Sequence, residues 1–135
     1  MTFGAFFQEN LWSFVLLSVV VGMLIVIEKK RMNTQVPKIS ALLVASKMEQ
    51  GALLLDIRDA ANFKLGHIAG AKNQPKLLEQ LAQYHDKTQA IILCDESGLR
   101  APNLANQMQA QGFSSVMVLH NGMQGWLEEN FPVVK

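Results

Sequence analysis

The feature that most constrains this chain is an apolar run without any charged residue, which extends from Leu11 to Ile27. As an α-helix this run would be about 26 Å long, close to the ~30 Å hydrocarbon core of a bilayer. Most of its residues are Leu, Ile, Val or Phe, and together they favour insertion by about 5 kcal/mol. A buried helix of a soluble domain is the alternative. We expect residues 1–31 to form a single transmembrane anchor, with residues 11–27 in contact with the lipid bilayer.

The charged residues on either side of the run predict its orientation. Only Glu9 and the amino terminus precede the run, whereas Glu28 is followed directly by Lys29, Lys30 and Arg31. Because Lys and Arg are retained on the cytoplasmic side, we expect the amino terminus outside and the rest of the chain in the cytoplasm, at the inner (plasma) membrane. A cleaved signal peptide has the opposite arrangement, with positive charge before the apolar run. The single cysteine also fits a reducing compartment.

Two small residues, Ser18 and Gly22, lie one helical turn apart within the apolar run. This spacing allows two helices to approach closely, so it is compatible with a homodimer through the anchor. Small residues are also tolerated in a helix that faces lipid. Both interpretations remain open at this point.

The segment after the anchor reads as a short tether, residues 32–38, followed by one domain, residues 39–135. Fully extended, the tether would span about 23 Å, so the domain must work close to the bilayer, where another membrane protein is a plausible partner. The net charge is only +1 and the basic residues gather near the anchor, which gives no reason to expect nucleic-acid binding. The His, Cys and carboxylate residues do not have metal-ligand spacing, and we expect neither a metal nor a cofactor.

Short apolar runs and helical patterns alternate along the remaining residues. The strand-like runs are residues 52–57, 70–74, 90–94 and 116–119. The helix-like segments are residues 40–51, 59–66, 75–84, 101–112 and 122–130. This alternation predicts an α/β domain with a mostly parallel central sheet flanked by helices.

In a parallel sheet the functional site lies beyond the carboxyl ends of the strands. Three loops meet this condition, after Ile57, Cys94 and Leu119, and only the middle loop has the residues of a site. Backbone N–H groups and the positive end of the following helix would point into this loop. We call it the anion-cradle loop, and its residues are Asp95, Glu96, Ser97, Gly98, Leu99 and Arg100.

Two longer motifs resemble the signatures of the rhodanese-like domain. The first is LLLDIRDAANFKLGHIAGAKNQP, residues 53–75. The residues that match it are Asp56, Arg58, Phe63, Gly66, His67, Ile68, Gly70, Ala71 and Asn73. The second is GFSSVMVLHNGMQGW, residues 112–126, in which Asn121 replaces a glycine and can adopt the same left-handed conformation. The resemblance covers residues 37–132 and implies the rhodanese-like fold, here behind a single membrane anchor.

The resemblance also suggests roles for three motif residues. Asp56 and Arg58 are expected to hold loops together as a charge pair. His67 is expected to bind backbone groups rather than to act as a catalytic base.

The resemblance implies that an active rhodanese has the loop Cys-x-Ser-Gly-x-Arg, whose cysteine carries sulfur as a persulfide. Aligned on Ser97, Gly98 and Arg100, the nucleophile position of this chain holds Asp95, and Cys94 occupies the preceding strand position, where side chains point away from the loop. A carboxylate at position 95 would accept the N–H bonds of the loop and fill the place of a substrate anion. This interpretation predicts a domain without catalysis that serves as a binding module.

Two enzymatic alternatives use Cys94 as the nucleophile. In the first, Cys94 carries a persulfide and the protein is a thiosulfate or persulfide sulfurtransferase. In the second, the spacing of Cys94 and Arg100 matches the Cys-x5-Arg loop of cysteine phosphatases, whose arginine binds phosphate. The phosphatase alternative has a cost, because Asp95 and Glu96 would raise the pKa of the thiol and repel phosphate.

Overall fold

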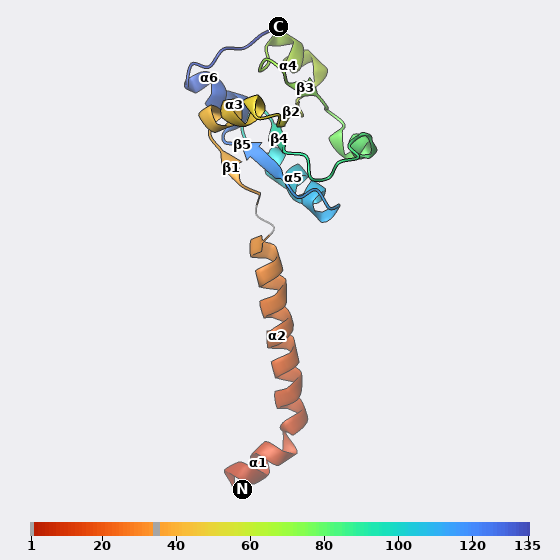
Figure 1. Cartoon of the computed structure of the whole chain (residues 1–135). Helices are drawn as coiled ribbons and strands as arrows, with labels where there is room; N and C mark the ends of the chain where they lie inside the picture. Colours follow the sequence, from red (N-terminus) through yellow and green to blue (C-terminus); the bar gives the residue numbers. More distant parts are fainter. Residues whose placement is uncertain (1, 34–35) are drawn as a thin grey trace. The chain divides into compact units, whose positions relative to one another are not determined.

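The computed structural model describes residues 2–33 and 36–135, which form two compact units, residues 1–35 and 36–135 (Figure 1). The predicted tether, residues 32–38, includes residues 34 and 35, which lie outside the described residues. The apolar helix continues to Asn33, because residues 29–32 are good helix formers, and the first strand of the domain begins at Lys38.

The amino-terminal unit contains two helices, α1 (Phe3–Glu9) and α2 (Leu11–Asn33). Within α2, the window Leu11–Lys30 is long and apolar enough to cross a membrane, with a mean hydropathy of 2.4, and none of this window is buried. Helix α1 was not predicted from the sequence, although Thr2 is a typical N-cap. The Thr2 hydroxyl accepts a hydrogen bond of 3.2 Å from the Ala5 N–H.

The domain is built on a five-stranded sheet with the order β1-β5-β4-β2-β3, and all of its pairings are parallel. The central strands are β2 (Leu53–Asp56), β4 (Ile91–Cys94) and β5 (Val116–Leu119), which correspond to three of the predicted apolar runs. The edge strands are β1 (Lys38–Ile39) and β3 (Lys72–Asn73). Strand β1 lies at the predicted boundary between tether and domain, and its two residues are too few to show a periodic pattern.

The predicted helices of the domain are present with one change of type. They are α3 (Ala41–Glu49), α4 (Ala60–Leu65), α5 (Ala101–Ala110) and α6 (Gly122–Glu128). Ser40 caps α3 as predicted, because its hydroxyl accepts a hydrogen bond of 3.3 Å from the Leu43 N–H. The segment expected to be helical at residues 75–84 is a 3-10 helix, η1 (Leu77–Gln83). Its first turn has no side-chain cap, which favours the tighter i→i+3 bonds of a 3-10 helix.

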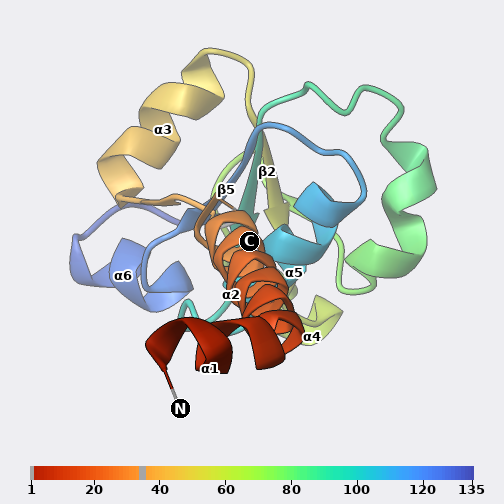
Figure 2. The same cartoon turned by 90° about the horizontal axis from the view of Figure 1, so that it is seen from below.

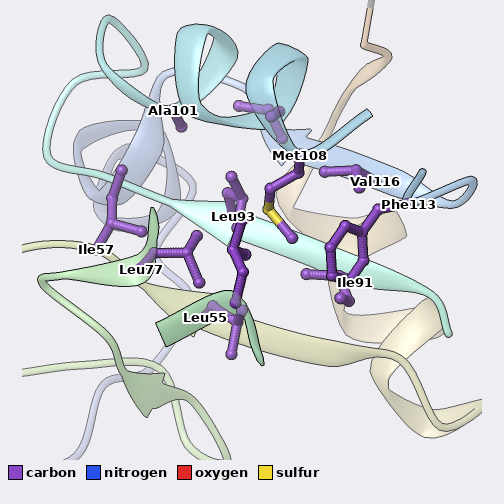
Figure 3. Close-up of a cluster of buried hydrophobic side chains, with 12 residues drawn as sticks. Leu55, Ile57, Leu77, Ile91, Leu93, Ala101, Met108, Phe113 and Val116 are labelled. Atoms are coloured by element: carbon purple, nitrogen blue, oxygen red, sulfur yellow. The ribbon is translucent and has the colours of Figure 1, made fainter. Parts of the chain in front are cut away.

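Two apolar clusters cover the two faces of the sheet. Along β4, Ile91 and Leu93 belong to the cluster on the α5 and η1 side, which is shown in Figure 3. Ile92 and Cys94 belong to the cluster on the α3 and α6 side. Figure 2 shows α3 and α6 on one side of the sheet and α5 on the other. Because neighbouring strand residues face opposite clusters, the direction of each side chain at the end of β4 is fixed by the fold.

Candidate functional site at the carboxyl edge of the sheet

The anion-cradle loop lies between the end of β4 and the start of α5, where the central strands of the sheet end together. The start of α6 binds this loop from the other side: the Met123 N–H donates to the Asp95 carbonyl at 2.8 Å, and the Gln124 N–H donates to the Glu96 carbonyl at 3.0 Å. The loop is therefore held by backbone bonds from a second, distant segment. No local sequence pattern predicts these two bonds.

The carboxylate of Asp95 occupies the centre of the loop and is surrounded by backbone N–H groups. Its Oδ1 accepts from Gly98 at 2.6 Å, and its Oδ2 accepts from Arg100 at 2.8 Å and Ala101 at 2.9 Å. The residue is only 3% exposed. Ala101 opens α5, so the carboxylate also lies at the positive end of that helix. This geometry agrees with the sequence-based expectation that a carboxylate here would accept the N–H bonds of the loop.

Gly122 leaves the room that Asp95 needs, and Gly98 lets the loop pass close to the Asn121 backbone. A Cβ atom at Gly122 would lie 2.6 Å from Asp95 Oδ1, and a Cβ atom at Gly98 would lie 3.0 Å from the Asn121 backbone nitrogen. Gly98 has φ +86, where only glycine is unstrained. Asn121 has φ 58 and ψ 13. This is the left-handed conformation expected of an asparagine that replaces the glycine of the family motif.

Cys94 lies on the other face of the sheet from the Asp95 carboxylate. Its side chain is buried in the apolar cluster that also contains Leu119, Met123 and Trp126. Burial raises the pKa of the Cys94 thiol, and the charge of Asp56 raises it further. The thiol is therefore protonated at neutral pH, whereas a nucleophilic cysteine needs its thiolate.

Arg58 and Asp56 form the predicted charge pair, and both are buried. Arg58 Nε lies 3.0 Å from Asp56 Oδ1, and Arg58 Nη2 lies 2.8 Å from Asp56 Oδ2. Arg58 Nη2 also donates to the Gly66 carbonyl at 2.7 Å, and Nη1 lies 3.5 Å from a Glu96 carboxylate oxygen. Burial opposes the charge of the guanidinium, but the hydrogen bond and charge of Asp56 outweigh it and raise the Arg58 pKa. Arg58 thus connects the loops after β2 and β4.

His67 binds backbone groups, as expected from the resemblance. Its Nδ1 lies 2.9 Å from the Phe63 carbonyl, and its ring stacks on the Phe63 ring with 3.8 Å between centroids. The His67 backbone N–H and carbonyl both pair with Val134 at 2.8 Å. His67 therefore holds the carboxy-terminal segment against α4 and does not face the Asp95 carboxylate.

The surface above the loop is a shallow depression of about 170 Å³. Its lining residues are Arg58, Asp59, Asn62, Asp95, Glu96, Ser97 and Arg100. Sequence reasoning missed Asp59 and Asn62, although the spacing of Asp59 and Asn62 is that of a helix N-cap, and the Asn62 N–H does donate to Asp59 Oδ1 at 2.9 Å. Leu99, at the tip of the loop, is 84% exposed. Within residues 2–33 and 36–135 there is no cluster of three or more His, Cys, Asp or Glu that could hold a metal ion.

Comparison with known proteins identifies the family of the domain. The family model of the rhodanese-like domain matches residues 40–129. The protein YibN of Escherichia coli strain K12 is 33% identical over 93 residues, which are 64% of this chain and 64% of YibN. The chain thus spans less than two thirds of the length of YibN.

A curated enzyme and a solved structure are also similar to this chain. The thiosulfate sulfurtransferase GlpE of Haemophilus influenzae strain PittEE is 34% identical over 90 residues, which are 64% of this chain and 83% of GlpE. The solution structure of the rhodanese-like domain of the Anabaena sp. Alr3790 protein has a TM-score of 0.64 at 24% identity, and covers 73% of this chain and 78% of that one. The similarity to the Anabaena structure supports the fold alone, whereas the family match over residues 40–129 and the identity to GlpE identify the family. With its carboxyl-edge loop and its parallel sheet, this chain belongs to the family of rhodanese-like domain proteins.

Proposed function

We propose that this chain is a single-pass membrane protein whose rhodanese-like domain is a non-catalytic binding module at the cytoplasmic face of the inner membrane. The observation that carries the proposal is the position of the Asp95 carboxylate, which accepts hydrogen bonds from three backbone N–H groups of the loop. The family resemblance implies that in an active rhodanese a persulfide or substrate anion fills this space. In this chain the protein's own side chain occupies it.

A carboxylate at position 95 also lacks the chemistry of sulfur transfer. The transfer needs a thiolate that attacks a sulfane sulfur and keeps it as a persulfide, and an oxygen of Asp95 does not do this. The negative charge of Asp95 further repels thiosulfate, sulfate and phosphate from the loop. Asp95 therefore acts as a built-in substitute for a bound anion.

The surface around Asp95 and Asn121 is the proposed contact face for a partner. Leu99 is 84% exposed there, an apolar side chain at the tip of a loop that the backbone bonds from α6 hold in place. The residues between Asn33 and Lys38 extend at most about 18 Å, so the domain stays near the membrane. A second membrane protein is therefore a suitable partner. The basic residues in the last turns of α2, Lys29, Lys30 and Arg31, support the cytoplasmic side, and a dimer through Ser18 and Gly22 stays a prediction.

The second candidate function is sulfur transfer through Cys94, and the similarity to GlpE favours it. It requires the thiol to leave the apolar cluster around Leu119 and Trp126 and to reach the loop. The phosphatase alternative has less support, because Asp95 fills the loop that would bind phosphate and Cys94 faces the opposite side of the sheet.

Sulfur loading of the full chain in detergent tests the proposal. The wild type, Asp95→Cys and the matched control Asp95→Ser are incubated with thiosulfate, and their intact masses are measured. We expect a gain of one sulfur atom in Asp95→Cys only, and this gain persists when Cys94 is also changed to Ser. A gain in the wild type that disappears in Cys94→Ser would make the protein a sulfurtransferase and overturn the proposal.

A further inference from the structure

Helix α1 has an aromatic face that the proposed function does not use. Residues in a helix turn by about 100° each, so Phe3, Phe6 and Phe7 lie within one narrow arc of α1. Gln8 lies on the opposite side, and Glu9 lies at the edge between the two faces. Helix α1 is therefore amphipathic, with three phenylalanine rings on one face and polar side chains on the other.

The polypeptide changes direction between α1 and α2, at Asn10 (Figure 1). The Asn10 side-chain amide donates to the Phe6 carbonyl at 2.8 Å and closes the end of α1. The Asn10 carbonyl accepts from the Ser13 and Phe14 N–H groups at 3.0 and 3.2 Å and opens α2. Asn10 thus ends one helix and starts the next, so α1 is not a straight extension of the apolar helix α2.

The aromatic face of α1 continues onto the first turn of α2 and is largely exposed. The rings of Phe7 and Phe14 stack with 4.7 Å between centroids, and those of Phe3 and Phe7 are 6.2 Å apart. Phe3 is 82% exposed, and Phe6 and Phe7 are 46% and 44% exposed. This aromatic strip, which consists of Phe3, Phe6, Phe7 and Phe14, lies at the Leu11 end of the predicted membrane span.

Helix α1 is too short to be stable in water by itself. It has seven residues, whereas isolated helices below about 12–15 residues are marginal. Its first turn has no acidic residue and its last turn has no basic residue, so side-chain charges do not offset the helix dipole. The caps from Thr2 and Asn10 offset only part of this deficit, and burial of the three phenylalanine rings is a further source of stabilisation. The membrane–water interface provides such burial and is the region where aromatic residues gather.

We propose that α1 is an interfacial helix that binds the surface of the lipid bilayer at the Leu11 end of α2. The Phe3, Phe6 and Phe7 rings enter the boundary between headgroups and acyl chains, and Gln8 and Glu9 face water. Helix α1 directly precedes the apolar helix α2, so its aromatic face lies next to the predicted membrane span. This position argues for lipid as the occupant of the face. The inference rests on the anchoring role of α2 in the proposed function, and it adds a second contact that fixes the depth of the anchor in the bilayer.

Single-tryptophan variants of the full chain in phosphatidylcholine vesicles test this inference. In a Trp12→Phe, Trp126→Phe background, Phe6→Trp reports on the aromatic face of α1, and Gln8→Trp is its matched control on the polar face. Quenching by acrylamide measures contact with water, and quenching by lipids brominated at different depths measures contact with the bilayer. We expect acrylamide quenching to be several-fold weaker for Phe6→Trp than for Gln8→Trp. We also expect shallow bromines to quench Phe6→Trp more strongly than deep ones.

Three results would overturn the inference. Equal acrylamide quenching of both variants would place α1 in water, and stronger quenching of Phe6→Trp by deep bromines would place α1 inside the hydrocarbon core. Shielding of Phe6→Trp from both quenchers would indicate contact with protein. Val20→Trp, in the middle of the apolar run, separates the two proposals. If deep bromines do not quench Val20→Trp, the anchor itself fails, whereas strong quenching there with an exposed Phe6→Trp contradicts only the interfacial helix.

Discussion

Cys94 and Asp95 are neighbours in the sequence, but they belong to regions with opposite chemistry. Cys94 is part of the apolar cluster between the sheet and α6, and its environment favours a neutral side chain. Asp95 lies in the loop, where three N–H groups and the start of α5 favour a negative one. The comparison shows that the position of a nucleophile matters as much as its presence. Cys94 lies one residue before the nucleophile position of the family, and there its side chain is part of the apolar core.

The exchange Cys94→Asp should have the largest effect, because it buries a carboxylate among apolar side chains without hydrogen-bond partners. We expect a loss of several kcal/mol of unfolding free energy, or a domain that does not fold. Circular dichroism during urea denaturation of the full chain in detergent measures this loss. Cys94→Ala, which places no charge in the apolar cluster, is the matched control and should lose much less. Equal stability of Cys94→Asp and the wild type would show that Cys94 is not a core residue.

Removal of the Asp95 carboxylate should have the next largest effect. Asp95→Ala leaves the N–H groups of Gly98, Arg100 and Ala101 without their acceptor, and one unsatisfied buried group costs about 1–3 kcal/mol. Water will reach part of the emptied loop and satisfy some of these N–H groups, so we expect a total loss of about 3 kcal/mol. Asp95→Asn should lose less, since its amide keeps one acceptor oxygen. Denaturant midpoints measure both variants, and an unchanged midpoint for Asp95→Ala would contradict the role of the carboxylate.

The emptied loop should then bind an external anion. In Asp95→Ala, sulfate or phosphate can take the position of the carboxylate and accept the same N–H bonds. At an anion concentration of ten times the dissociation constant, binding would raise the stability by about 1.4 kcal/mol. The melting temperature is measured with sulfate and with chloride at equal ionic strength. The wild type should show no difference between the two salts, and the same absence in Asp95→Ala would contradict the idea of a built-in substitute for an anion.

The last effect, which is absent at neutral pH, is a pH dependence that comes from Cys94. Burial raises the folded-state pKa of this thiol above the unfolded value, so its stabilising contribution is complete below the unfolded pKa of about 8.5. As the pH rises above that value, the unfolded state loses its proton while the folded state keeps it. The contribution then falls by up to about 1.4 kcal/mol per pH unit.

The matched variant for this measurement is Cys94→Ala, which has no titrating group at this position. The stability difference between the wild type and Cys94→Ala should be constant from pH 6 to pH 8 and should shift against the wild type from pH 8.5 to pH 10. Urea denaturation at a series of pH values tests the slope. A difference that stays constant up to pH 10 would indicate a solvated thiol.

The sequence was sufficient for the parts of the molecule that have strong local patterns. The apolar runs of β2, β4 and β5 were visible because their residues are buried on both faces of a parallel sheet. The Ser40 cap was visible because residue type and position identify it, and the Asp56–Arg58 pair followed from the resemblance to the rhodanese-like motif. The alignment of Ser97 and Gly98 with the family loop also showed that Asp95, and not Cys94, occupies the nucleophile position.

Other features had no local pattern to reveal them. Strand β1 has two residues and exists because β5 offers it partners: the Val118 N–H donates to the Pro37 carbonyl, and the His120 N–H donates to the Ile39 carbonyl. The 3-10 geometry of η1 and the short helix α1 also lacked a distinctive sequence pattern.

The sequence alone thus determined the apolar helix, the order of strands and helices, and the presence of a carboxylate where the family has its nucleophile. The helix and the strands follow from residue type and local apolar patterns, and the position of the carboxylate follows from the alignment with the family loop. Tertiary structure decided how the loop is held, because the bonds from Met123 and Gln124 to residues 95 and 96 join segments almost thirty residues apart. It also decided that Gly122 leaves space for the Asp95 carboxylate, since only the packing of α6 on β4 brings those two residues together.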